Sequence, residues 1–248
     1  MKNTRLLAAA LLCLLAPLAL APLALAPPAL APPALASSAL ASSHTVDSGL
    51  TEAGWRLLTF DPPPARFRQL EMGGIEVEAE GSVAVLYRSV TGDEAAKPVL
   101  AWRWRVDRSD IQPVDLGRKE RADRPIALHV GFEQDDSTGD FMRALAARMT
   151  GAPPPGRVIT YTWGGTHEAG TVLVSPYLGD EGRIVILRSG TAPLGDWVAE
   201  TVDLHADFRR FFGYAPPPVA YIAISADADD QPGHTLARIA DIRFQNAE

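Results

Sequence analysis

The stretch Leu100-Ala101-Trp102-Arg103-Trp104-Arg105-Val106 decides how the rest of the chain is interpreted. At the two-residue period of a β-strand, the four apolar residues at alternate positions from Leu100 to Val106 point to one side, and Arg103 and Arg105 point to the other. The pattern predicts an interior strand with an aromatic core face and a cationic opposite face. Two interpretations of the arginines stay open. They are solvated or paired with carboxylates of neighbouring strands, or they line a groove for a polar or anionic ligand.

Short alternating or apolar segments recur along the chain. They predict strands over 54–60, 75–80, 83–88, 100–106, 126–133, 157–163, 171–175, 183–189, 197–202, 219–226 and 236–244. Helical periodicity is confined to 138–149 and 206–212. Because strands and helices do not alternate, a parallel sheet is not expected. We predict an all-β fold, an antiparallel two-sheet β-sandwich of the jelly-roll (galactose-binding-like) type with two short helices.

Residues 1–41 differ in kind from the rest of the chain. A short basic start and an apolar run precede five-residue Ala/Pro/Leu repeats, which recreate the Ala-Leu-Ala pattern that signal peptidase recognises. We therefore predict a secretory signal over 1–41, cut after Ala26, Ala36 or Ala41, then a polar segment at 42–53 and a single domain at 54–248. The apolar run is too short and too rich in proline to span a bilayer, so we expect a periplasmic or secreted protein with no transmembrane span.

The charge balance restricts the partners. The sequence has 23 Lys and Arg against 30 Asp and Glu, and loss of the predicted signal would leave 21 against 30. Such an acidic chain is a poor partner for nucleic acid or anionic lipid. The single cysteine, Cys13, lies in the predicted signal, so the mature domain would depend on its hydrophobic core rather than on disulfides. The oligomeric state is not indicated.

A ligand site is expected if aromatic and polar side chains share one sheet face. The candidates are Arg103, Arg105, His129, Glu133, Tyr161 and Trp163. Flat rings stack on sugar C–H surfaces, while Arg, Glu and His hydrogen-bond to hydroxyls. Trp163 can equally lie in the core, since the face depends on strand register. His129 and Glu133 are ~13 Å apart along one strand and cannot contact each other directly.

A second candidate site is the acidic loop Asp227-Ala228-Asp229-Asp230 after a predicted strand. Asp227, Asp229 and Asp230 bring hard oxygen ligands close together, which suits Ca²⁺, the one cofactor that the sequence suggests. The loop lacks the glycine and distal glutamate of an EF-hand, and an acidic turn whose side chains bond their own backbone explains it equally. The sequence has no zinc spacing, no nucleophile elbow and no phosphate-binding glycine loop.

An ordered set of motifs resembles one known family. The motifs are Leu-x-Trp-Arg-Trp-x-Val at 100–106, Tyr-x-Trp at 161–163, Ile-Leu-Arg-Ser-Gly at 186–190, Asp-Phe-Arg-Arg-x-Phe-Gly at 207–213, Asp-x-Asp at 227–229 and Ala-Asp-Ile-Arg-Phe at 240–244. Together they resemble a secreted bacterial domain-of-unknown-function family (three-zero-four-seven) from about Trp55 to Phe244. The resemblance implies no activity. Members carry paired aspartates and an arginine where this chain has Ala122-Asp123 and Ala127, so a family site there would be incomplete in this chain.

The favoured hypothesis is a non-catalytic periplasmic binding module for a glycan or another polar component of the cell envelope. One alternative is a glycan-processing enzyme, a lyase or hydrolase, that uses His129, Glu133 and the two arginines. Another is a structural partner in an envelope complex that makes contact through 138–149. Enzymatic activity is left open, with binding preferred, because jelly-roll sandwiches support both and the fold alone does not assign function.

Overall fold

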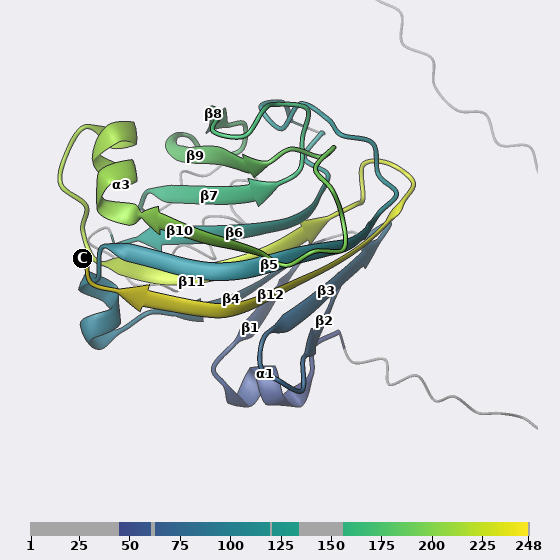
Figure 1. Ribbon diagram of the computed structural model, residues 1–248, viewed down its shortest axis with the longest axis horizontal. Helices are drawn as coiled ribbons and strands as arrows, with labels where there is room; N and C mark the ends of the chain where they lie inside the picture. The colour runs from purple at the N-terminus through teal and green to yellow at the C-terminus, as the bar shows by residue number, and fades with distance from the viewer. Residues whose placement is uncertain (1–44, 61–62, 120, 134–155, 248) are drawn as a thin grey trace, which may run out of the picture. The chain divides into compact units, whose positions relative to one another are not determined.

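The strand that contains Trp102 and Trp104 is an interior strand of one of the two sheets that form a sandwich (Figure 1). The computed structural model describes residues 45–60, 63–119, 121–133 and 156–247. The seven-stranded sheet has the order β1 (Arg56–Thr59), β4 (Val83–Ser89), β11 (Val219–Asp227), β6 (Arg124–Phe132), β7 (Val158–Trp163), β9 (Gly179–Arg188) and β8 (Val172–Ser175). The five-stranded sheet has the order β10 (Val198–Asp203), β5 (Val99–Ser109), β12 (His234–Gln245), β3 (Ile75–Glu80) and β2 (Arg66–Gln69).

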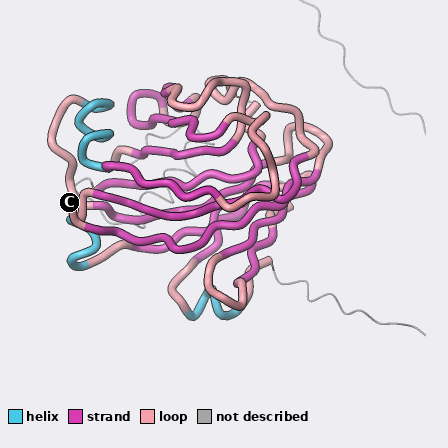
Figure 2. Tube along the Cα trace, viewed as in Figure 1, coloured by secondary structure: helices cyan, strands magenta, loops and turns pink. Residues whose placement is uncertain are grey.

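The strand pairing confirms the predicted fold class, an all-β two-sheet sandwich of jelly-roll type, in which strands dominate the described chain (Figure 2). The pair β7–β9 is parallel, whereas the other paired strands of the two sheets are antiparallel. The exception has a simple cause. The chain passes from β7 to the edge strand β8 and turns back, so that β9 is inserted between them.

Helix α3 (Leu204–Phe212) confirms the predicted helix at 206–212. The Asp203 side chain caps its start by accepting a hydrogen bond from the backbone N–H of Ala206 at 2.8 Å, and Gly213 ends it in the left-handed conformation. Helix α1 (Ser48–Glu52), the 3₁₀ turn η1 (Gly92–Ala96) and strand β2 were not expected from the sequence. The predicted helix at 138–149 and the predicted signal at 1–41 lie outside the described residues.

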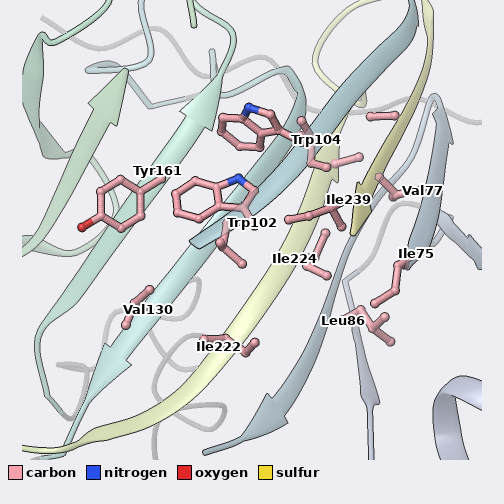
Figure 3. Packing of buried hydrophobic residues seen from close by; sticks show 14 of the residues in the cluster. Ile75, Val77, Leu86, Trp102, Trp104, Val130, Tyr161, Ile222, Ile224 and Ile239 are labelled. Carbon is pink, nitrogen blue, oxygen red and sulfur yellow. The ribbon is translucent and has the colours of Figure 1, made fainter. Parts of the chain in front are cut away.

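The alternation in β5 produces the core as predicted. Leu100, Trp102, Trp104 and Val106 are at most 1% exposed, and they face the seven-stranded sheet. The ring centroid of Trp102 lies 5.6 Å from that of Tyr161, and the ring centroid of Trp104 lies 5.9 Å from that of Trp163. The rings of Trp102, Trp104 and Tyr161 lie together in Figure 3. Aromatic contacts across the two sheets, tilted in the first pair and edge-to-face in the second, thus help to hold the sandwich together.

The seven-stranded sheet also carries a small apolar cluster on its outer face, the face turned away from the five-stranded sheet. Its members are Val85, Val158, Leu178, Tyr221 and Ala223. A side chain at Gly131 would meet the Tyr221 ring, because a Cβ there would lie 1.7 Å from Tyr221 Cζ. The glycine therefore lets Tyr221 lie across β6. Among the helices of the described ranges, none has the length and apolar character needed to cross a membrane.

Candidate functional site

A cavity of about 190 Å³ lies on the outer face of the seven-stranded sheet. Side chains of β4, β6, β7, β9 and β11 line it, and the turn Pro176–Leu178 between β8 and β9 adds to its wall. The small apolar cluster supplies several of the lining residues, including Val85, Val158 and Ala223. The outer face is therefore not a flat solvated surface but holds an apolar-walled recess with polar groups in it.

A row of hydrogen-bonded polar side chains crosses three strands in this cavity. His129 Nδ1 lies 3.0 Å from Thr160 Oγ1, and His129 Nε2 lies 2.8 Å from Ser225 Oγ. Arg124 Nη2 donates to the same Ser225 Oγ at 3.2 Å. Strand register explains the grouping, since β6 pairs with β7 on one side, where His129 is opposite Thr160, and with β11 on the other.

Burial, together with the nearby positive charge of Arg124, lowers the pKa of His129 to about 3. The imidazole is therefore neutral at neutral pH, and it donates through one ring nitrogen and accepts through the other. Both nitrogens are already engaged by hydroxyl groups. His129 accordingly orients Thr160 and Ser225 in the cavity and is not a cation that attracts an acidic ligand.

At one end of the row, three carboxyl groups come together. Oxygen atoms of Asp123, Asp227 and Asp229 lie within 4.8 Å of one another. Asp227 Oδ2 accepts a hydrogen bond from Arg124 Nη1 at 3.4 Å, and Asp123 Oδ1 accepts one from the backbone N–H of Asp230 at 3.2 Å. Asp227 and Asp229 also line the cavity, so this acidic group opens into it.

Burial raises the pKa of Asp123, with the neighbouring carboxylates adding to the increase. The pKa of Asp227 is raised well above its usual value by the same cause, against the opposing effect of Arg124. Full ionisation of the three carboxyl groups therefore costs free energy. The cost is avoided when a carboxyl keeps its proton or when a cation balances the charge. The site can hold protons or a positively charged ion more readily than exposed aspartates can.

The six predicted ligand residues do not share one sheet face, and that expectation is wrong. Tyr161 and Trp163 are buried between the sheets, because the alternation of β7 turns Thr160 and Thr162 outward instead. The Tyr161 hydroxyl donates to Asp207 Oδ2 at 2.8 Å.

Of the remaining four predicted residues, His129 lines the cavity. Glu133 is exposed just beyond the end of β6, where its backbone N–H donates to the carbonyl of Pro218 at 2.8 Å. His129 and Glu133 thus lie apart, as their spacing along the strand predicted.

Arg103 and Arg105 lie on the outer face of the other sheet. Arg103 Nε lies 2.7 Å from Asp241 Oδ2, and Arg105 Nε lies 2.8 Å from Asp107 Oδ1. The guanidinium carbons of Arg103 and Arg105 lie 4.7 and 5.4 Å from the ring centroid of Trp197, where cation–π attraction is favourable. Asp241 has φ of 56° next to an irregularity in β12, which places its carboxylate at Arg103. Of the two interpretations of these arginines, pairing with carboxylates is confirmed.

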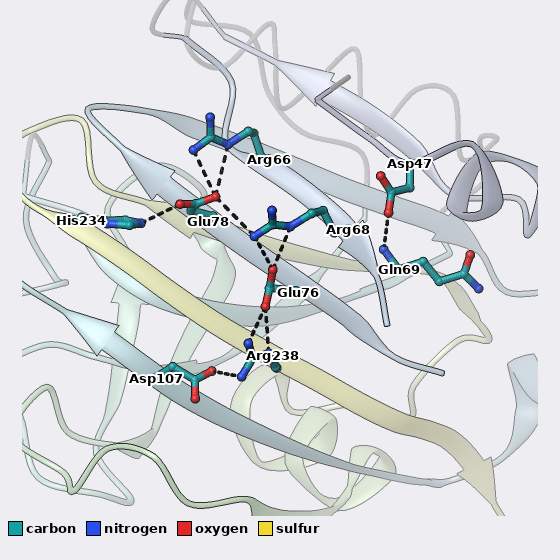
Figure 4. Close-up of polar contacts among 9 residues, drawn as sticks. All are labelled: Asp47, Arg66, Arg68, Gln69, Glu76, Glu78, Asp107, His234 and Arg238. Atoms are coloured by element: carbon teal, nitrogen blue, oxygen red, sulfur yellow. Dashed lines mark hydrogen bonds and ion pairs between the residues drawn. The ribbon is translucent and has the colours of Figure 1, made fainter. Parts of the chain in front are cut away.

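The pairing of charges continues across this face of the five-stranded sheet. Arg238 contacts both Glu76 and Asp107, with nitrogen–oxygen distances of 2.7 Å in each pair, and Arg68 contacts Glu76 at 2.6 Å (Figure 4). His234 reaches Glu78 at 2.9 Å. Positive and negative side chains thus alternate across β2, β3, β12 and β5, and this surface balances its own charge.

The acidic group contains only two of the three aspartates that the sequence predicted as metal ligands. Asp227 and Asp229 belong to it, but the third carboxylate comes from Asp123 and not from Asp230. Asp230 Oδ2 instead accepts a hydrogen bond from the backbone N–H of Ala122 at 3.2 Å. Sequence reasoning also missed Arg124, Thr160 and Ser225. Their signal was present in the alternation of β6, β7 and β11, but only the register shows that they meet.

A family model described as "Protein of unknown function (DUF3047)" matches residues 53–243, which confirms the resemblance seen in the motifs. No curated protein matches the sequence.

Several solved structures are similar to the chain at low sequence identity. The xyloglucanase domain of NopAA from Sinorhizobium fredii, in complex with cellobiose, is 8% identical over 77% of this chain and 93% of that chain, with a TM-score of 0.39. A cellulase derived from Cel12A of Rhodothermus marinus is 10% identical over 77% and 95%, with a TM-score of 0.41. The agarase AgWH50C is 10% identical over 79% of this chain and 24% of its own, with a TM-score of 0.32.

Proposed function

The chain belongs to the DUF3047 family, and we propose that its cavity on the seven-stranded sheet binds a carbohydrate or another hydroxyl-rich component of the cell envelope. The observation that carries the proposal is the convergence of Arg124, Ser225 and the acidic group in a recess with apolar walls. Binding sites for small polar molecules commonly combine apolar lining with a few convergent polar groups.

The polar groups suit hydroxyls in particular. Carboxylates accept hydrogen bonds and guanidinium groups donate them, and a sugar hydroxyl can do both. Arg124 Nε has no hydrogen-bond partner among the described residues, although it is buried. A ligand hydroxyl at this nitrogen would remove the cost of leaving a buried donor unpaired. Asp229 is exposed at the edge of the same cavity and supplies an acceptor.

The size and the wall of the cavity favour a small part of a glycan. Its volume of about 190 Å³ is below the range of about 300–1,000 Å³ typical of pockets for drug-sized ligands. Tyr177 lines the cavity and is 37% exposed, so its ring can meet the C–H face of a sugar. We infer that a single sugar ring, such as a terminal residue of a longer chain, enters the recess.

The test is binding of a panel of oligosaccharides, measured by titration calorimetry on the domain spanning 42–248. The panel contains cellobiose, xyloglucan and agar fragments and uronic-acid oligosaccharides. For a sugar that binds, Arg124→Gln should weaken affinity at least about 10-fold, because a charged donor to the ligand is lost. Arg103→Gln is the matched control. It makes the same substitution on the other sheet and should leave affinity unchanged.

Two outcomes would overturn the proposal. One is that the domain binds no member of the panel at millimolar concentration. The other is that Arg103→Gln weakens binding as much as Arg124→Gln, which would move the site to the opposite face of the sandwich.

A second function, glycan hydrolysis, is favoured by one specific observation. Asp227 is a buried carboxyl with a raised pKa at the edge of the cavity, beside the exposed carboxyl of Asp229. A buried carboxyl with a raised pKa, beside a second carboxyl, is the arrangement that general acid catalysis of glycoside cleavage uses. Incubation of the panel with the protein and analysis of reducing ends tests this function. Product formation that Asp227→Asn abolishes would establish it, and an unchanged panel would exclude it for these sugars.

A further inference from the structure

We propose that Asp123, Asp227 and Asp229 bind one hard divalent cation, Ca²⁺ or Mg²⁺, at the acidic end of the cavity. The proposal goes beyond the binding of a carbohydrate and stands on its own geometry. It also differs from the set that the sequence indicates, since Asp123 takes the place of Asp230.

The first support is the position of the ligand atoms. Each of the three residues offers one carboxylate oxygen, and these oxygens lie within 4.8 Å of one another. Two oxygens that bind the same ion at 2.3–2.6 Å can be no farther apart than about 5 Å. The three side chains therefore already lie at a spacing that a single ion can bridge, although they come from two segments about a hundred residues apart in sequence.

The second support is independent of this spacing. Asp123 Oδ2 and Asp227 Oδ1 are buried atoms without a hydrogen-bond partner among the described residues, although the side-chain amide of Gln231 approaches the Asp123 carboxylate. The residues themselves are 1% and 8% exposed. A buried carboxylate oxygen without a donor costs free energy, and buried charges in proteins are normally paired or coordinate metals. A cation between these side chains would satisfy both oxygens at once.

The local charge also favours a bound cation. Asp123, Asp227, Asp229 and the neighbouring Asp230 carry four carboxyl groups, whereas Arg124 is the one cationic side chain that the described structure brings into contact with them. One guanidinium cannot balance the group when it is ionised. A divalent cation would bring the site close to neutrality, and oxygen-only ligands select hard ions such as Ca²⁺ and Mg²⁺ over softer metals.

The surroundings hold one ligand in place and leave the ion accessible. The backbone N–H of Asp230 fixes Asp123 Oδ1, and the backbone N–H of Ala122 in turn fixes Asp230 Oδ2. These two hydrogen bonds join the segment before β6 to the loop after β11. Asp227 and Asp229 line the cavity, so an ion can enter from it and keep coordination positions for water or for a ligand.

The experiment uses the domain spanning 42–248 after treatment with a chelator, in buffer with 150 mM NaCl. Thermal unfolding is followed with CaCl₂, with MgCl₂ or with added NaCl of equal ionic strength. An ion bound by the native state alone should raise Tm by roughly 5–10 °C at about 100-fold excess over its Kd. Titration calorimetry with the same ions should give one site per chain.

Asp229→Asn is the decisive variant, because Asp229 is the exposed member and its replacement leaves the buried pair in place. It should abolish most of the metal-dependent rise in Tm. Asp230→Asn is the matched control: it removes a charge one residue away, from outside the three ligands, and keeps an oxygen for the N–H of Ala122. It should retain the rise.

Three results would overturn the proposal. The first is no rise in Tm with either ion beyond the NaCl control. The second is an equal rise in wild type and Asp229→Asn. The third is an equal loss in Asp229→Asn and Asp230→Asn, which would indicate diffuse attraction to an acidic surface instead of a site. None of them depends on sugar binding, so the two proposals fail separately.

Discussion

His129 and Ser225 are 96 positions apart in the sequence, yet His129 Nε2 lies 2.8 Å from Ser225 Oγ. The contact joins β6 to β11 through their side chains, in addition to the backbone pairing of the two strands. It is also the middle link of the hydrogen-bonded row that runs from Thr160 through His129 and Ser225 to Arg124. Because the row depends on a neutral imidazole, protonation of His129 should disturb it.

We predict that His129 makes the domain sensitive to mild acid. Its pKa is about 3 in the folded protein and near 6.5 when the chain is unfolded. The unfolded state therefore binds the proton first, and the stability contributed by the neutral ring is complete above pH 6.5 and is lost as pH falls toward 3. Between pH 6.5 and 5 the loss is at most about 2 kcal/mol, because uptake of one proton changes stability by about 1.4 kcal/mol per pH unit, and partial exposure of the ring to the cavity reduces it further.

Urea unfolding of wild type and His129→Gln at several pH values measures this loss. Glutamine keeps a donor and an acceptor but does not titrate, so the difference between the two proteins isolates His129. The carboxyl of Asp227, whose raised pKa acts on stability with the opposite sign, contributes equally to both proteins. Parallel stability curves from pH 7 to pH 4.5 would contradict the prediction.

The two core tryptophans of β5 should be among the most costly residues to truncate. Trp102 and Trp104 are at most 1% exposed and contact each other and the opposite sheet. We expect Trp102→Ala and Trp104→Ala each to lower the free energy of unfolding by about 3–5 kcal/mol or to prevent soluble expression. Trp197→Ala, a partly exposed tryptophan on the outer face of the same sheet, should cost clearly less. Equal costs at the three positions would contradict this assignment of faces.

Alternation was enough to predict the fold and the orientation of β5. The two-residue period places Trp102 and Arg103 on opposite faces through backbone geometry alone, and the apolar rings of Trp102 and Trp104 make their face the buried one. The same alternation did not decide the orientation of β7, because either the face with Thr160 or the face with Tyr161 could have been the buried one. Only the pairing with β6 and the packing on Trp102 settle that Tyr161 is buried.

The candidate site could be predicted only in part, because long-range contacts build it. The acidic loop after β11 was visible as a local pattern, and His129 as a polar residue on the outer side of an alternating strand. Asp123 joins the loop through a backbone hydrogen bond from Asp230, 107 positions away, and no local spacing encodes that contact. Strand β2 was missed because it is short and buries one residue, Phe67.

The N-terminal region gives a prediction that is separate from the fold. We expect the protein to be exported and its signal to be removed within the Ala/Pro/Leu repeats, because each repeat boundary recreates an Ala-Leu-Ala pattern. Mass spectrometry of the protein from the periplasmic fraction of an expressing bacterium should show a first residue between 27 and 42. Recovery of the intact chain from Met1 in the cytoplasmic fraction would contradict export.

The last prediction concerns the charged outer face of the five-stranded sheet, where similar ion pairs should contribute differently to the free energy of unfolding. Arg103 and its partner Asp241 are 45% and 53% exposed, and exposed pairs contribute about 0–1 kcal/mol. Arg105 is less exposed, but its partner Asp107 keeps a second arginine, Arg238, when Arg105 is lost. The double variant Arg103→Gln, Arg105→Gln should therefore lower stability by no more than about 1 kcal/mol.

Arg238→Gln should cost more than that double variant, although it removes one charge instead of two. Arg238 lies between Asp107 and Glu76, and the Glu76 side chain is 9% exposed. Loss of Arg238 leaves one oxygen of a buried carboxylate without its donor, which costs about 1–3 kcal/mol. Urea unfolding of the two variants at low and at high salt measures both effects, and the cost of Arg238→Gln should persist at high salt because buried pairs are weakly screened. A larger cost in the double variant would show instead that Arg103 and Arg105, through their contacts with Trp197, hold this face together.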